Sequence, residues 1–411
     1  MPSTAAGAKA RVFLVAVAAM LAIQIVSSFA IQSIPVLAPV AAPDLGVSRH
    51  DVGYFMAFVY VAAILSSSAG GLLAARYGAV RVSQASLLCS GAAITVFGLG
   101  SVWLLVPAAL LMGTGMGPPT PASSQVLARV TPPRLASLTF SVKQTGVPLG
   151  NMVAGLAIPA LVALGTWQGA AWVVGLCCLA LALAVEPLRP VLDVEPAARA
   201  GGGMLAAMRD LFLPVRRVWN AADLRRLALV SFVFTAMQVT FGAFLVVYLV
   251  QHIGLDLATA GLVLAIGQLT GAGARVVWGA IADSSGRPAL TLACLCLGMA
   301  AGAATLAMLD TGWSMAGLAA AAILYGSTAI GWGGVFFAEL ARRAPAGAVA
   351  TITGGAQFFT FSGALIVPPL FSLLLTLFGS YALNFALLAG VSAACVPLLL
   401  PLVQAERRRS R

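Results

Sequence analysis

Twelve apolar stretches, each long enough to cross a lipid bilayer as a helix, dominate the 411 residues of this chain. A hydrocarbon core about 30 Å thick requires roughly 20 helical residues at about 1.5 Å each. Charged residues make up only 9% of the chain, whereas a soluble domain carries about 25% to cover its surface. We therefore predict an all-α integral membrane protein with two groups of six transmembrane helices. The stretches lie near residues 12–37, 52–75, 82–101, 103–127, 136–164 and 168–188, and near 226–250, 257–281, 289–309, 313–339, 348–377 and 380–403.

The basic residues predict which helix ends face the cytoplasm, because Lys and Arg collect in the cytoplasmic loops of membrane proteins. With both termini placed there, 20 of the 23 basic residues lie on that side, and Arg49 lies in an outer loop. The remaining two, Lys143 and Arg275, fall inside predicted spans. We predict a multi-pass protein of the cell inner membrane with both termini cytoplasmic.

Several functional classes do not fit this composition. A net charge of +11 would suit nucleic acid if Lys and Arg were clustered among aromatic and polar residues, but here they separate long apolar runs. The six cysteines lie within apolar segments without metal-ligand spacing to either histidine, so we expect them to pack. No catalytic constellation or phosphate loop stands out. We expect no enzyme activity, no metal, no cofactor and no nucleic-acid partner.

The two halves of the chain repeat in register. Glycine is expected where helices approach closely or the chain turns tightly. A shift of 208 residues places Gly46, Gly53, Gly71 and Gly78 on Gly254, Gly261, Gly279 and Gly286, and a shift of 213 places Gly113, Arg129, Gln144 and Gly150 on Gly326, Arg342, Gln357 and Gly363. Two parallel six-helix repeats with a substrate site near the midplane are one plan of secondary transporters. We predict an N-terminal bundle at 1–190 and a C-terminal bundle at 225–411.

The polar segment at 191–224 joins these bundles. Apolar residues from Met204 to Trp219 recur at helical spacing beside Arg209, Arg216 and Arg217. This pattern predicts an amphipathic helix at the interface with the acidic inner leaflet. We interpret the segment as a tether, with a regulatory or partner-binding role as the alternative.

Two matching turns carry a family resemblance. The turn after the second span contains Gly71, Ala75, Arg76, Gly78 and Arg81, and the turn after the eighth contains Gly279, Asp283, Gly286 and Arg287. Both resemble the glycine–aspartate–basic loop of the major facilitator superfamily, as does the six-plus-six plan of the whole chain. The resemblance implies that acid and base latch neighbouring helix ends on the cytoplasmic side. The first copy has Ala75 where the family usually has aspartate, and Ala109 stands where the family has its fourth-span arginine.

Lys143 and Arg275 are the two charges predicted inside the membrane. A charge at the bilayer centre costs about 2.5–3.5 kcal/mol on insertion scales and marks a functional site by default. Arg275 precedes Asp283 by eight residues and Lys143 follows Arg134 by nine, which places both roughly 12–13 Å in from the cytoplasmic side. The sequence places none of its twelve acids at that depth. An anionic substrate is the predicted complement, and a structural role for each cation is the alternative.

The surroundings of both cations favour a carboxylate substrate. Arginine presents a planar fork that matches a carboxylate with two parallel hydrogen bonds. The setting of Arg275 is similar to the eighth-span arginine of organic-anion members of the superfamily, including monocarboxylate and oxalate–formate carriers. The resemblance implies that spans five and eight flank one central cavity. The remaining polar residues that we expect at the substrate site are Gln144, Tyr60, Gln268, Gln357, Gln24, Gln238, Tyr248 and Asn151.

These patterns lead to one hypothesis and two alternatives. We predict a secondary transporter that moves small organic anions by alternating access, as a monomer, either coupled to protons or by exchange. A proton-driven exporter of drugs or metabolites is favoured by a Gly-Val-Pro-Leu-Gly fragment beginning at Gly146, but the cationic site opposes it. A membrane sensor would need a soluble output domain, for which a linker of this length is too short.

Overall fold

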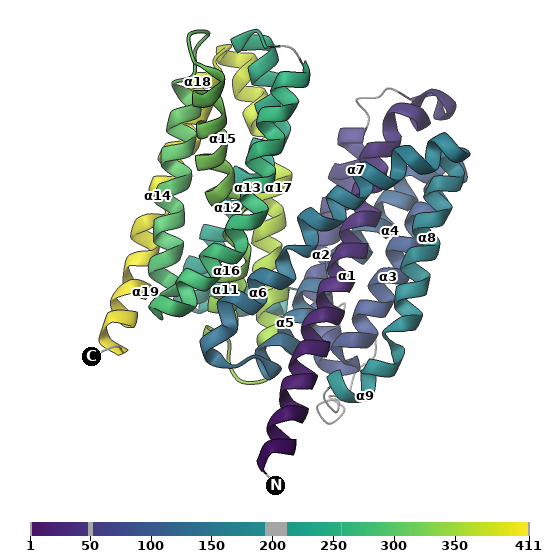
Figure 1. The fold of residues 1–411 in the computed structure, drawn as a ribbon, viewed down its shortest axis with the longest axis vertical. Coiled ribbons are helices and arrows are strands. Elements are labelled where there is room, and N and C mark those ends of the chain that lie inside the picture. The colour runs from purple at the N-terminus through teal and green to yellow at the C-terminus, as the bar shows by residue number, and fades with distance from the viewer. Residues whose placement is uncertain (1, 48–51, 194–211, 256, 410–411) are drawn as a thin grey trace. The chain divides into compact units, whose positions relative to one another are not determined.

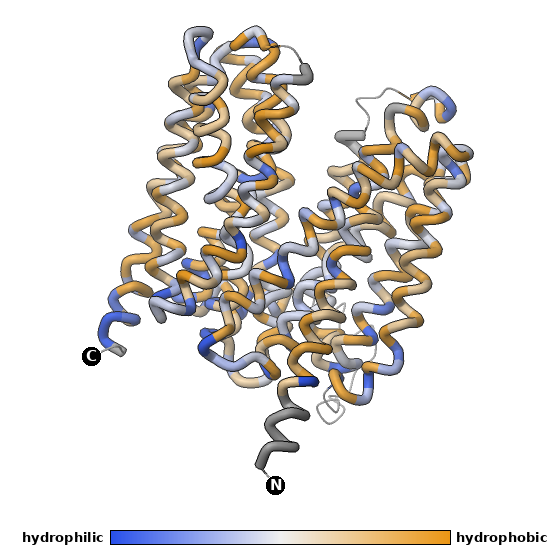
Figure 2. The backbone as a smooth tube through the Cα atoms, in the orientation of Figure 1, coloured by the Kyte–Doolittle hydropathy of each residue, from blue (hydrophilic) through white to orange (hydrophobic). Residues whose placement is uncertain are grey.

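The computed structural model describes residues 2–47, 52–193, 212–255 and 257–409, and every regular element in those ranges is a helix. Twelve of the described segments are long and apolar enough to cross a membrane, which confirms the predicted fold class. Figure 2 shows these segments as predominantly hydrophobic, with hydrophilic residues concentrated toward their ends. The segments are Ala10–Ala38, Phe55–Tyr77, Ala79–Phe97, Val102–Val130, Pro133–Leu164, Trp167–Leu192, Ala222–Ile253, Thr259–Ser285, Pro288–Ala307, Met315–Arg343, Val349–Phe378 and Tyr381–Arg408.

The chain forms two compact units that exchange two short segments (Figure 1). Unit 1 consists of Met1–Pro132, Val142–Asn220 and Ala344–Phe358. Unit 2 consists of Pro133–Ser141, Ala221–Arg343 and Phe359–Arg411. The start of the fifth span therefore groups with the C-terminal spans, and the start of the eleventh with the N-terminal spans.

Unit 1 is a bundle in which α1 packs along α7, α2 along α4, and α3 along α8. Its helices are α1 (Pro2–Leu45), α2 (Val52–Tyr77), α3 (Ala79–Phe97), η2 (Val102–Leu104), α4 (Leu105–Met116), α5 (Pro119–Val130), α7 (Gly146–Leu164), α8 (Trp167–Ala184), η4 (Glu186–Leu188), α9 (Arg189–Leu192), α11 (Leu213–Asn220) and the first turns of α17 (Val349–Phe378). The fourth span is broken between α4 and α5, at the proline pair Pro118-Pro119. The second proline has no N–H with which to continue the helix.

Unit 2 repeats this plan, with α13 packed along α15 and α14 packed between α15 and α18. Its helices are η3 (Pro133–Leu135), α6 (Ala136–Gln144) up to Ser141, α12 (Ala222–Tyr248), the π-helical η5 (Leu249–Ile253), α13 (Leu257–Ser285), α14 (Pro288–Ala307), α15 (Met315–Ala329), α16 (Gly333–Arg343), the rest of α17, α18 (Tyr381–Ala393) and α19 (Val396–Arg409). Gly254 ends the π-helix with φ of 83°, a conformation that glycine adopts readily.

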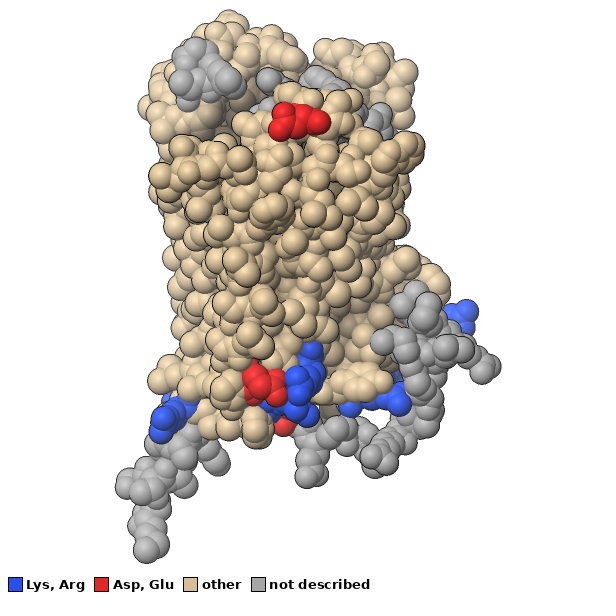
Figure 3. All heavy atoms as spheres, turned by 90° about the vertical axis from the view of Figure 1, so that its right-hand side faces the viewer, with Lys and Arg blue, Asp and Glu red and all other residues tan. Residues whose placement is uncertain are grey.

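The outer surface of the helices suits lipid. Large apolar side chains such as Leu156, Leu164 and Leu269 are exposed. On the face drawn in Figure 3, the described charged side chains gather toward the ends of the helices, and uncharged residues fill the broad band between them. This distribution is that of a protein whose central band faces hydrocarbon.

The structure describes only part of the predicted linker. Residues 194–211 lie outside the described residues, so the predicted helix is seen only from Leu213 onward. There Pro214 and Val218 are buried in unit 1, and a Cβ added at Gly355 of α17 would lie 2.3 Å from the Pro214 carbonyl oxygen. The buried side of α11 is therefore covered by protein, while Arg216, Arg217 and Trp219 are exposed.

Candidate functional site

Lys143 lies at a break in the fifth span. The span consists of α6, which ends at Gln144, and α7, which begins at Gly146. Pro148 lies in the first turn of α7 and has no N–H to donate to the carbonyl of Gln144, so the regular hydrogen-bond ladder is interrupted beside the lysine. Thr145 closes the gap with a tighter bond from its N–H to the Val142 carbonyl at 3.2 Å. The sequence thus puts the lysine beside a joint in its own helix.

The ammonium of Lys143 is buried among amides of unit 1. Its side chain is only 2% exposed, and Nζ donates to Oε1 of Gln24 at 2.6 Å and to Oε1 of Gln144 at 3.3 Å. Gln24 in turn donates from Nε2 to Oγ of Ser28 at 3.3 Å. The structure therefore brings together three of the predicted site residues, Lys143, Gln24 and Gln144. Both acceptors are neutral, so they satisfy hydrogen bonds of the ammonium without neutralising its charge.

Glycines allow the helices around this cluster to approach. A Cβ added at Gly146 would lie 2.8 Å from Cβ of Gln24, and one added at Gly150 would lie 2.4 Å from the carbonyl oxygen of Ile25. Both distances are shorter than carbon and oxygen atoms tolerate. The close contact of α1 with α7 therefore depends on these glycines and brings Gln24 within reach of Lys143.

Arg275 lies on α13 within unit 2 and is 4% exposed. One turn before it, Gly271 faces Gly326 and Ile330 at the end of α15, and one turn after it, Gly279 faces Ser137 and Ser141 of α6. Trp278 donates from its indole to the Ser327 carbonyl at 3.0 Å. The arginine is thus carried by a helix face that packs closely on both sides of it.

The other predicted residues are dispersed. Gln357 is buried at the start of α17 in unit 1, Tyr60 is half-buried on α2, and Asn151 is exposed on α7. In unit 2, Gln268 is exposed beside Gly242 of α12. Sequence reasoning gave no sign that Gln238 is joined to Trp332, whose indole donates to Gln238 Oε1 at 3.1 Å.

Tyr248 is held by hydrogen bonds and ring stacking within unit 2. Its hydroxyl donates to the carbonyl oxygens of Leu306 and Leu309 at 3.0 and 3.1 Å, and its ring stacks on those of His252 and Tyr381. These contacts close the end of unit 2 at which the π-helix lies. We therefore assign this tyrosine to packing.

The turn after the eighth span contains a residue that caps a neighbouring helix. Asp283 accepts hydrogen bonds from the backbone N–H groups of Ser137 at 2.9 Å and Leu138 at 2.7 Å, at the start of α6. Arg342 donates to the Ser137 hydroxyl at 3.1 Å. Arg287, the basic partner expected from the resemblance, has an exposed side chain, and Gly286 turns the chain with φ of 62°. The acid therefore holds a neighbouring helix end, and the base that reaches this end comes from α16.

The corresponding turn after the second span has a different source for its carboxylate. Gly78 has φ of 95°, and a Cβ there would lie 2.4 Å from the carboxylate of Asp193. Asp193 accepts from the N–H of Val80 at 2.7 Å and so caps α3. Arg76 lies over the ring of Tyr77, 5.3 Å from its centroid. The carboxylate of this turn comes from just after α9, a source that its local sequence does not reveal.

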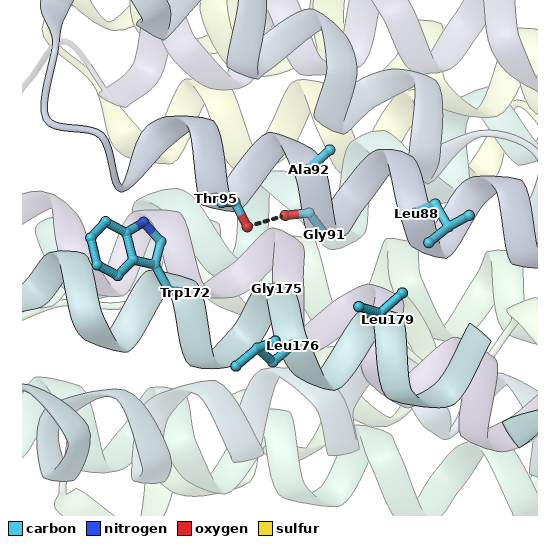
Figure 4. Close-up of a pocket in the computed structure, with 8 residues that line it drawn as sticks. All are labelled: Leu88, Gly91, Ala92, Thr95, Trp172, Gly175, Leu176 and Leu179. Carbon is cyan, nitrogen blue, oxygen red and sulfur yellow. Dashed lines mark hydrogen bonds between the residues drawn. The ribbon is translucent and has the colours of Figure 1, made fainter. Parts of the chain in front are cut away.

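An apolar groove lies apart from these residues, between α3 and α8 of unit 1 (Figure 4). Its volume is about 370 Å³, and Leu88, Trp172 and Leu176 line it. The hydroxyl of Thr95 points back to the Gly91 carbonyl at 2.8 Å. None of the predicted site residues lines this groove, and its apolar lining offers nothing to recognise a charge.

Comparison with known proteins identifies the class. The sequence profile of the Major Facilitator Superfamily matches residues 20–368. The chain belongs to this superfamily, whose members and structural neighbours here are transporters and not enzymes.

Two curated relatives are transporters. One, an uncharacterised MFS-type transporter of Mycobacterium tuberculosis (strain H37Rv), is 29% identical over 227 residues, covering 54% of this chain and 47% of the relative. The 4-hydroxybenzoate transporter PcaK of Pseudomonas aeruginosa is 29% identical over 152 residues, covering 36% of this chain and 33% of PcaK. The chain thus spans about half or less of the length of the curated relatives it matches.

Solved structures share the fold over nearly the whole chain. The human organic anion transporter MFSD10 (TETRAN) superposes with a TM-score of 0.75 at 16% identity, covering 95% of this chain and 99% of that one. A bacterial homologue of the iron transporter ferroportin in an outward-facing state gives a TM-score of 0.74 at 16% identity, covering 96% and 100%. At such identities the likeness extends to the fold alone.

Proposed function

We propose that this transporter carries small organic carboxylates, by proton coupling or by exchange. The observation that carries the proposal is a lysine ammonium buried in a membrane-spanning segment and held by the neutral oxygens of Gln24 and Gln144. Charged groups in such segments are costly, and they mark the paths of ions and substrates. A lysine ammonium attracts a carboxylate through its charge and its hydrogen-bond donors.

Arg275 supports the same substrate class from the second unit. It is a second buried cation within a membrane-spanning segment, and its guanidinium can bind a carboxylate through two parallel hydrogen bonds. The substrate of one sequence relative agrees with the proposal, since 4-hydroxybenzoate, which PcaK transports, is a carboxylate.

Flux into proteoliposomes tests the proposal. Purified protein is reconstituted, and uptake of radiolabelled 4-hydroxybenzoate is followed with an inward proton gradient, with a protonophore, and with unlabelled substrate inside. We expect saturable uptake that Lys143→Gln and Arg275→Lys each reduce by at least about tenfold in kcat/KM, the effect of losing one partner of a desolvated charge pair. Arg217→Lys, an exposed change on α11, serves as the matched control.

The arms of this experiment separate the alternatives. Dependence on the proton gradient indicates symport, and dependence on internal substrate indicates exchange. Flux of a panel of carboxylates that is the same in wild type and both cation variants would overturn the proposal. Efflux of a cationic dye without carboxylate flux would favour the drug exporter instead.

A further inference from the structure

Gln238 lies on the protein-facing side of α12 but is not fully buried. Phe234 and Phe241, about one turn before it and one turn after it, are 0% exposed, whereas Gln238 itself is half-buried. Its accessible part therefore faces away from lipid, within a membrane-spanning segment. A polar side chain in such a place either bonds a neighbouring helix or lines a path for solutes.

The indole of Trp332 fixes the orientation of this amide. An indole N–H can only donate, so it must meet the amide oxygen, and it lies 3.1 Å from Oε1 of Gln238. The amide nitrogen, with its two N–H donors, consequently points away from the indole. Among the described residues, no protein group accepts a hydrogen bond from this nitrogen. The donors of Gln238 are therefore available to a solute.

Trp332 is held at the break in the tenth span, in the turn between α15 and α16. Its side chain is 5% exposed, and its ring packs edge-on against those of Phe234 and Phe336, with 5.4 Å between the centroids in both pairs. The break in the helix thus places a firmly packed donor beside Gln238.

The level of Gln238 relative to Arg275 follows from the packing of α12 on α13. These consecutive membrane spans run antiparallel, and a Cβ added at Gly242 of α12 would lie 3.6 Å from Nε2 of Gln268 of α13. Gln238 precedes Gly242 by four residues, which makes it level with Ala272 of α13. Along the helix axis that is three residues, or roughly 5 Å, from Arg275.

This spacing separates two kinds of recognition. In the proposed function, the guanidinium of Arg275 binds the carboxylate of the substrate through two parallel hydrogen bonds. The donors of Gln238 lie on another helix and at another level, and an amide N–H can bind only an acceptor atom such as an oxygen. The two residues together suit a substrate that has a second oxygen, in a hydroxyl or carbonyl group, away from its carboxylate.

We propose that Gln238 binds this second oxygen, and that Trp332 is a positioning residue that turns the amide toward it. The transported class is then carboxylates that also carry a hydroxyl or carbonyl group, and carboxylates without one are poor substrates. This inference rests on the proposed carboxylate transport.

The test compares two carboxylates that differ by one hydroxyl group. Uptake of labelled 4-hydroxybenzoate and of labelled benzoate is measured in proteoliposomes that contain the full chain, and the ratio of the two kcat/KM values is determined. We expect wild type to favour 4-hydroxybenzoate by at least about tenfold, because a site that bonds a hydroxyl discriminates against the analogue without it. Damage to the fold lowers both values alike and leaves their ratio unchanged.

Two variants assign this preference to its residues. Gln238→Met keeps the length of the side chain but removes both donors, and we expect the ratio to fall to about one. Trp332→Phe keeps an aromatic ring but removes the indole N–H, and we expect the ratio to fall by at least about threefold. In the double variant the ratio should be no lower than in Gln238→Met, because the indole acts through the amide.

Matched controls lie in unit 1. Gln168→Met on α8 and Trp103→Phe in η2 make the same chemical changes elsewhere and should keep the wild-type ratio. A wild-type ratio retained in Gln238→Met would overturn the role of the amide, and one retained in Trp332→Phe would overturn the role of the indole. Equal kcat/KM values for the two compounds in wild type, or transport restricted to carboxylates without a second oxygen, would overturn the inference and leave carboxylate transport intact. If wild type carries no carboxylate of the panel, the proposed function fails first, so the two failures are distinguishable.

Discussion

Two helix crossings, that of α2 with α17 in unit 1 and that of α13 with α6 in unit 2, are packed closely at a glycine but differ in their charged residues. In unit 1, a Cβ at Gly71 of α2 would lie 2.4 Å from the carbonyl oxygen of Ala350 at the start of α17. In unit 2, the repeat mate Gly279 of α13 meets Ser137 and Ser141 of α6 in the same way. The shift of 213 residues that relates the fifth and eleventh spans places Ser137 on Ala350. The close backbone contact is therefore repeated.

The chemistry at these crossings is not repeated. Asp283 caps α6 in unit 2, whereas its counterpart Ala75 has no oxygen to offer α17. Arg275 likewise corresponds to Ser67, which donates to the carbonyl of Gly354 at 3.4 Å. The two copies thus share the small residues that set the helix distances, whereas the charges of Arg275 and Asp283 have no counterpart at Ser67 and Ala75.

Among changes at the two crossings, removing the charged cap of α6 should lower the stability of the protein most. Asp283→Ala loses two hydrogen bonds from a carboxylate to backbone N–H groups, and we expect the free energy of unfolding to fall by about 2–3 kcal/mol. Thermal unfolding of the purified protein in detergent measures this. Asp283→Asn, which retains one acceptor oxygen, should lose less. Wild-type stability in Asp283→Ala would mean that the cap contributes nothing.

The second-largest loss of stability is expected from adding a methyl group where α2 crosses α17. Gly71→Ala places a methyl group against the Ala350 carbonyl, and separating the two helices should cost about 1–3 kcal/mol. Gly279→Ala should cost less, because the nearest backbone atom there, the carbonyl oxygen of Ser137, lies at 2.9 Å rather than 2.4 Å. The control is Gly273→Ala, where no atom lies within 4 Å. Equal melting temperatures for Gly71→Ala and Gly273→Ala would contradict the close approach.

Adding the missing acid should make the two crossings more alike. Ala75→Asp supplies a carboxylate at the position corresponding to Asp283, and a cap on the first N–H groups of α17 should stabilise the protein by about 1 kcal/mol. The neighbouring change Ala74→Asp points the same group into the buried side and should destabilise. A loss of stability in Ala75→Asp would show that the crossings differ in geometry as well as charge.

The smallest effect on stability is expected from the carboxylate of Asp193, which caps α3 at the turn after the second span. Burial raises the pKa of Asp193, although the backbone N–H of Val80 opposes this. Because the folded state then holds the proton more tightly than the unfolded state, stability should fall slightly as the pH rises from about 4 through the raised pKa. Asp193→Asn should lose this dependence in melting curves between about pH 4 and 7. An unchanged pH profile would exclude Asp193 as its source.

The sequence was sufficient for the fold because hydropathy and length define membrane helices almost independently of tertiary contacts. It was also sufficient for Gly71 and Gly279, whose register in the repeat pointed to close contacts. It could not reveal that Lys143 meets Gln24, 119 residues away, or that Asp193 caps α3. Those contacts depend on how helices distant in the chain are packed, and no local pattern encodes them. The role of Arg275 at the substrate stays a prediction.

The exchange of segments between the two units has a mechanical consequence. The polypeptide passes from unit 2 into unit 1 between Ser141 and Val142, one residue before Lys143 and directly before the joint at Thr145. Lys143 therefore belongs to a helix whose two ends are packed in different units. A conformational change of the transport cycle would thus act on the proposed substrate-binding lysine through its own main chain.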